Sequence, residues 1–89
     1  MNKEELLNYN IMCGAELLVN CYYDGVIEEP KPLSEWVNYV YNAITKNLFT
    51  PDYMEMGNNV CRFFSKEVIK EKTIEYLKSC DRIKEYIIF

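Results

Sequence analysis

The chain has 89 residues, of which 49% are hydrophobic and 15% aromatic, and its formal net charge at pH 7 is −4. This length fits one domain, residues 1–89, with a thin hydrophobic core. The acidic balance lacks the basic footprint that binds phosphate backbones, so we expect no direct contact with nucleic acid. No run of about 18 apolar residues and no secretory signal is found, and we expect a cytoplasmic protein that does not enter the membrane.

The sequence lacks the residues that most often carry chemistry. It contains no histidine, no Cys-x-x-Cys pair and no glycine-rich loop. A nucleophilic serine or cysteine would have no recognisable base beside it. We therefore expect no enzyme, no metal site and no cofactor. The cysteines are expected to be reduced thiols that fill apolar helix faces; they are Cys13, Cys21, Cys61 and Cys80.

The first predicted helix runs from about Asn2 to Tyr23. Asn2 is a candidate N-cap, with Glu5 three residues later as in a capping box. Gly14 lies in the middle of a broad apolar face and would allow another helix to cross closely. A second apolar strip on the opposite face suggests contact with a partner; it consists of Met12, Val19 and Tyr23.

The segment after this helix allows two interpretations. Asp24-Gly25 is suited to end a helix, because glycine adopts the left-handed C′ conformation easily. Alternatively, residues 17–29 form a hairpin around the same Asp-Gly pair. Residues 26–33 are expected to be a stiff, exposed linker, since Pro30 and Pro32 favour extended backbone.

The second predicted helix begins at Ser34 as N-cap and continues to about Leu48. Its polar face carries Tyr39, which is a candidate aromatic contact for a partner. The third helix begins at Thr50-Pro51-Asp52, a cap followed by proline at the first helical position and a carboxylate that favours the helix dipole. This segment is expected to continue to about Phe64.

The fourth predicted helix follows Ser65 as N-cap and extends unbroken to Tyr86. Ile74 interrupts its charged face and is a second candidate contact. The last four residues, 86–89, are apolar and are expected to dock on the core or on a partner. An acidic ridge at spacing i, i+4, i+8 follows the same helix and is a candidate surface for a partner; it comprises Glu67, Glu71 and Glu75.

These elements predict an all-α fold, a small four-helix bundle-like domain with short loops. The surplus of apolar and aromatic side chains suggests self-association or a partner surface. The chain is rich in Asn, Lys, Ile and Tyr and poor in Ala and Arg, a bias typical of AT-rich bacterial genomes and of their phages and mobile elements.

Our first functional hypothesis is a non-enzymatic inhibitor or adaptor that binds a host protein, as anti-CRISPR and other anti-defence proteins do. Apolar contacts within a polar rim are typical of such interfaces. A different hypothesis is an oligomeric sponge that sequesters a small signalling nucleotide between subunits. Its cationic and aromatic contacts would come from Arg62, Arg82, Lys31, Tyr39 or Trp36.

A third hypothesis comes from a short sequence likeness. The run Val37-Asn38-Tyr39-Val40-Tyr41, followed by Phe49-Thr50 and Tyr53, is similar to the middle helices of bacteriocin-immunity proteins. The resemblance covers less than a quarter of the chain and implies a helical bundle. Proteins of that family are typically basic, whereas this chain is acidic.

Overall fold

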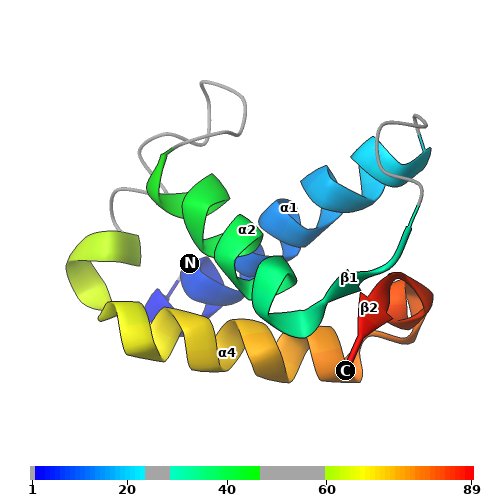
Figure 1. The fold of residues 1–89 in the computed structure, drawn as a ribbon. Helices are drawn as coiled ribbons and strands as arrows, with labels where there is room; N and C mark the ends of the chain where they lie inside the picture. The colour runs from blue at the N-terminus through cyan, green and yellow to red at the C-terminus, as the bar shows by residue number, and fades with distance from the viewer. Residues whose placement is uncertain (1, 24–28, 47–59) are drawn as a thin grey trace.

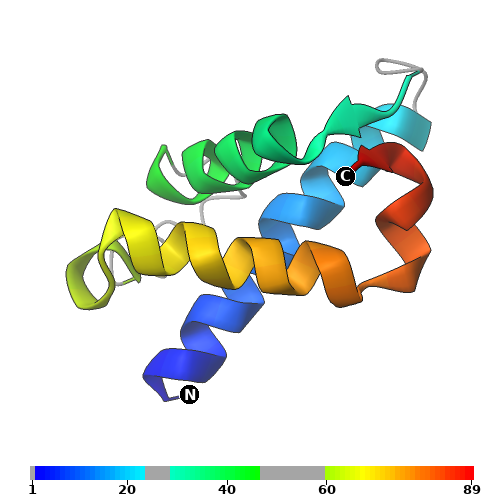
Figure 2. The ribbon, with the colours of Figure 1, turned by 60° about the horizontal axis from the view of Figure 1, so that its bottom comes forward.

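Three α-helices form the body of the described part of the chain. The computed structural model describes residues 2–23, 29–46 and 60–89. Helices α1 (Lys3–Tyr23), α2 (Leu33–Thr45) and α4 (Lys66–Ser79) each contact the other two. Helices α2 and α4 run antiparallel, and α1 crosses both of them (Figures 1 and 2). Residues 60–63 are also helical. The all-α, bundle-like prediction is therefore confirmed.

Helix α1 begins at the predicted capping box. The Asn2 side chain accepts a hydrogen bond from the Glu5 backbone N–H at 2.8 Å, and the Asn2 amide donates to the Glu5 carboxylate at 2.7 Å. Residues 17–23 belong to this helix, so they do not form the first strand of the alternative hairpin over residues 17–29, and that alternative is wrong. Residues 24–28 lie outside the described part.

The crossing of α1 and α2 depends on Gly14. A Cβ atom at this position would lie 3.0 Å from Cγ1 of Val40 and 3.5 Å from the Val40 Cα atom. This spacing is tighter than most van der Waals contacts, so the backbone of α1 approaches α2 where a side chain is absent. The sequence prediction of a close crossing at Gly14 is confirmed.

Helix α2 begins two residues earlier than the sequence predicted, with Leu33 as its first residue. Pro32 is the N-cap residue and no side chain caps the helix, so Ser34 lies inside the first turn. Proline is well suited to lead into a helix, because its φ angle is already fixed near the helical value. The predicted N-cap role of Ser34 is therefore wrong. Helix α2 ends at Thr45, with Lys46 as its C-cap residue, so it ends about three residues sooner than predicted. The Thr50-Pro51-Asp52 start of the third helix lies outside the described residues.

Helix α4 begins as predicted but ends sooner. The Ser65 hydroxyl accepts a hydrogen bond from the Val68 N–H at 3.3 Å. At Cys80 the backbone turns to extended values, φ −92° and ψ 96°, and a 3-10 helix, η2 (Asp81–Tyr86), follows. The prediction of one unbroken helix to Tyr86 is wrong. Hydrophobic periodicity missed this break, because Ile83 remains buried on the far side of the bend.

The chain ends in a short strand that pairs with the linker before α2. Strands β1 (Lys31–Pro32) and β2 (Ile87–Ile88) are parallel, with Lys31 opposite Ile87 and Pro32 opposite Ile88. The indole N–H of Trp36 donates to the Tyr86 carbonyl oxygen at 2.8 Å. Of the exposed linker expected over residues 26–33, Glu29, Pro30 and Pro32 are exposed, whereas Lys31 and Leu33 are half-buried. Residues 26–28 lie outside the described part.

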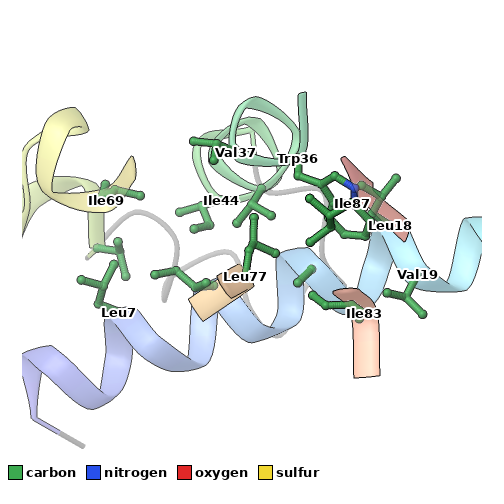
Figure 3. Packing of buried hydrophobic residues seen from close by; sticks show 14 residues of the cluster. Leu7, Leu18, Val19, Trp36, Val37, Ile44, Ile69, Leu77, Ile83 and Ile87 are labelled. Carbon is green, nitrogen blue, oxygen red and sulfur yellow. The ribbon is translucent and has the colours of Figure 1, made fainter. Parts of the chain in front are cut away.

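One buried cluster contains residues of α1, α2, α4, η2 and β2 (Figure 3). Trp36 and Leu18 have no exposed surface, and Ile87 places the end of the chain in the same cluster. The two buried polar side chains of the described region are satisfied within their own helices. The Asn10 amide donates to the Leu6 carbonyl oxygen at 2.8 Å, and the Thr73 hydroxyl donates to the Ile69 carbonyl oxygen at 2.7 Å.

Candidate functional site

Helix α4 forms one surface groove with α1 and another with α2. The first, which we call the α1–α4 groove, has a volume of about 390 Å³. Met12 is exposed and Tyr76 is half-buried, and both contribute apolar surface. Glu5 and Asn8 are exposed and supply a polar rim. Tyr9 completes the lining. An apolar centre within a polar rim is the common anatomy of a protein interface.

Helical spacing explains how α1 builds its side of this groove. Glu5, Tyr9 and Met12 are four and three residues apart, so they lie one above another on a single face. At the far end of the same face, Glu16 forms an ion pair with Arg82 of η2. This pair ties η2 to α1 beside the groove and neutralises the Glu16 carboxylate.

Tyr76 lies in an environment that disfavours its ionised form. Burial, followed by the proximity of Cys80 and its hydrogen bond with the Tyr76 side chain, raises the pKa of Tyr76 to about 12. Cys13 has a smaller effect in the same direction. Burial also raises the pKa of the Cys13 thiol, and a hydrogen bond with Tyr9 partly opposes this effect. At neutral pH, this side of the molecule therefore presents neutral hydroxyl and thiol groups.

The second groove, the α2–α4 groove, has a volume of about 300 Å³. Its lining combines aliphatic side chains with a few polar ones; the residues are Leu33, Ser34, Val37, Asn38, Lys70 and Ile74. The Lys70 ammonium donates to the Asn38 side-chain oxygen at 3.0 Å. It also lies 5.5 Å from the centroid of the Tyr41 ring, and the Lys66 ammonium lies 5.4 Å from the same centroid.

The apolar residues that the sequence suggested as partner contacts lie in different places in the structure. Met12 lines the α1–α4 groove, whereas Ile74 lines the α2–α4 groove. Tyr39 is half-buried and packs against the core instead of standing on a polar face. Val19 is only 1% exposed and belongs to the buried cluster, so its assignment to a surface strip is wrong. The Tyr23 side chain lies outside the described part.

Val19 is buried in a cluster that includes a residue from outside α1. The sequence shows which residues of α1 share a face, but it does not show that η2 covers an additional side of the helix. Val19 and Ile83 of η2 belong to the same buried cluster (Figure 3). The predicted strip of Met12, Val19 and Tyr23 is therefore not one continuous surface.

The acidic ridge on α4 lies in solvent. Glu67, Glu71 and Glu75 are all exposed. Glu75 forms an exposed ion pair with Lys72 at 3.4 Å. Such pairs are worth little to stability, so the ridge remains a source of negative potential for a basic partner.

The residues considered for nucleotide binding are dispersed. Trp36 is in the core and donates to Tyr86, Arg82 pairs with Glu16, and Lys31 pairs with Glu35 at 3.6 Å. None of these three residues lines the α1–α4 groove or the groove between α2 and α4.

Several groove residues were missed at the level of sequence. Tyr9, Asn8 and Tyr76 line the α1–α4 groove, and Lys70 lines the α2–α4 groove. The signal for Lys70 was its position one turn after Lys66, but only the packing of α4 against α2 places both ammonium groups over Tyr41.

Comparison of the chain with protein-family models, with characterised proteins and with solved structures finds no match. Within residues 2–23, 29–46 and 60–89, no three His, Cys, Asp or Glu side chains are grouped in a way that could hold a metal ion. None of the helices in these ranges is long and apolar enough to cross a membrane.

Proposed function

We propose that this protein is a small non-enzymatic inhibitor or adaptor that acts by stoichiometric binding to a host protein. Within that class, we propose an anti-defence role of the anti-CRISPR kind, in the cytoplasm of a bacterium infected by a phage or carrying a mobile element. The α1–α4 groove is the observation that supports this proposal. Its Met12 side chain is 39% exposed, beside half-buried Tyr76 and exposed polar groups.

The chemistry of this groove fits a protein partner. Methionine is flexible and polarizable, so it adapts to apolar surfaces of different shapes. Tyrosine adds a large apolar ring with a polar end. Glu5 at the rim and the exposed ridge of Glu67, Glu71 and Glu75 favour a partner surface that carries basic residues.

The proposal is tested by affinity purification from lysate of an AT-rich bacterial host. The tagged protein is expected to recover one dominant partner in a fixed ratio. Met12→Asp places a charge at the apolar centre and should abolish recovery. Asn42→Asp is the matched control, because it adds the same charge at an exposed position of α2.

Equal recovery by both variants would remove the α1–α4 groove from the proposal. An eluate without a partner, from wild-type protein shown to be folded by circular dichroism, would contradict the proposal itself. Light scattering on a size-exclusion column measures in parallel whether the chain forms the homo-oligomer that its apolar surplus suggests.

A further inference from the structure

We propose that the α2–α4 groove binds a small amphipathic anion, a molecule with an aliphatic or aromatic body and one carboxylate, sulfonate or phosphate group. This site is separate from the α1–α4 groove, and the inference does not depend on the proposed function. It rests on a cationic cluster next to an apolar floor.

The cationic cluster consists of Lys66 and Lys70. Both ammonium groups lie within 5.5 Å of the centroid of the Tyr41 ring. The face of an aromatic ring attracts cations, and this attraction offsets part of the repulsion between the two like charges. Lys66 and Lys70 are one helical turn apart on α4, and like charges at this spacing repel each other. An anion placed between them would relieve the repulsion that remains.

Helix α4 adds to the positive potential at this point. Lys66 is its first residue, and a helix N-terminus carries a partial positive charge. The neighbouring carboxylates, Glu67 and Glu71, each follow one of the lysines by one residue. They are therefore rotated about 100° around the helix axis from the lysines. Both are exposed, and neither lines the groove.

The apolar half of the site is the floor of the groove. Leu33, Val37 and Ile74 line it, together with the polar groups of Ser34 and Asn38. A volume of about 300 Å³ lies at the lower end of the range typical of small-molecule sites. An apolar body would lie on this floor, and its anionic group would accept hydrogen bonds from the Lys70 ammonium.

The hydrogen bond between Lys70 and Asn38 prepares the site for this role. It holds the ammonium group at the edge of the groove and leaves it further protons to donate, since a lysine side chain has three. Ser34 is exposed inside the first turn of α2 and has no capping role there. Its hydroxyl is a second donor beside the apolar floor.

The inference is tested by titrating the full chain, labelled with nitrogen-15, with decanoate below its micelle concentration. Two-dimensional amide spectra are expected to show saturable shifts confined to residues 33–38 and 66–74. Hexanoate should bind more weakly than decanoate, because it covers less apolar surface. Decyltrimethylammonium, which has the same chain and the opposite charge, should produce no saturable shift in this groove.

Charge-removing variants test the role of the lysines. Lys66→Gln with Lys70→Gln is expected to weaken decanoate binding about tenfold or more. Lys72→Gln with Lys78→Gln removes the same charge from exposed positions of the same helix and should leave the affinity unchanged within about twofold. Thermal melts establish that both double variants are folded.

Four results would overturn the inference. The first is equal binding of decanoate and decyltrimethylammonium, which would show that the chain alone is recognised. The second is a set of shifts centred on residues 5–12, which would place the molecule in the α1–α4 groove. The third is unchanged affinity in the variant lacking Lys66 and Lys70. Absence of any saturable shift with wild-type protein would contradict it as well.

Discussion

Substitution of Gly14 by alanine has two opposing effects on the free energy of unfolding, one from helix propensity and one from packing. Alanine is favoured over glycine inside a helix by about 1 kcal/mol, so propensity alone predicts a more stable protein. The new methyl group, however, would lie 3.0 Å from Cγ1 of Val40. Val40 has no exposed surface and its β-branched side chain has one preferred rotamer in a helix, so it cannot easily turn away.

The magnitude follows from these two opposing contributions. Overpacking of a core by one methyl group typically costs about 1–3 kcal/mol. After the gain in propensity, Gly14→Ala should lower the free energy of unfolding by about 1 kcal/mol. For a domain of this size, this change corresponds to a fall in Tm of about 4–8 °C. The assay is urea and thermal unfolding followed by circular dichroism.

Two comparisons isolate the cause. Asn8→Ala, at an exposed position of α1, should stabilise the protein by a few tenths of a kcal/mol, because it changes propensity without a clash. In a Val40→Ala background the clashing Cγ1 atom is absent, so Gly14→Ala should become neutral or stabilising. The coupling energy of this double-mutant cycle should reach about 1 kcal/mol or more. A Tm that rises on Gly14→Ala with Val40 present would refute the reasoning.

Three further predictions concern caps, the chain end and pH. Ser65→Ala should lower the free energy of unfolding in urea by about 1 kcal/mol, because the Ser65 hydroxyl caps α4. Ser34→Ala should change it by less than about 0.5 kcal/mol. Equal losses in the two variants would contradict the observed caps. Trp36→Phe should destabilise by about 1–3 kcal/mol, since it removes the donor to the Tyr86 carbonyl, and an unchanged Tm would show that this bond contributes nothing. The pKa of Tyr76 is raised from 10.0 to about 12 in the folded state, so its phenol loses its proton at a lower pH in the unfolded chain. The contribution of this group to the free energy of unfolding is fully present below pH 10 and is lost as the pH rises towards 12. Thermal melts over that range should show a smaller decline for Tyr76→Phe than for wild type, and parallel declines would count against the shifted pKa.

Local sequence signals predicted much of the helical framework. The Asn2–Glu5 capping box, the Ser65 cap and the close crossing at Gly14 each depend on a few neighbouring residues or on one missing side chain. Such signals are readable because the physical cause lies within one helical turn or at one position. Within the segment predicted as the fourth helix, Leu77 and Ile83 are buried, although Ile83 belongs to η2.

What the sequence did not reveal depends on contacts between distant segments. The pairing of β1 with β2 joins two-residue strands that have no periodicity of their own. The burial of Val19 depends on the bend at Cys80, which brings Ile83 of η2 into the core. The grooves depend on how α4 packs against both α1 and α2, so Lys70 and Tyr76 could not be assigned to them from helix wheels.

The parallel pairing of β1 and β2 has a consequence for the order of folding. It joins residues 31–32 to residues 87–88, and the bond from Trp36 to Tyr86 spans 50 positions. Closing so long a loop carries an entropic cost that contacts within a helix avoid, so this contact is expected to form late. The chain contains a single tryptophan, and it lies at that junction. The time course of its fluorescence during refolding should therefore report when this contact forms. Far-ultraviolet circular dichroism should report the earlier formation of the helices.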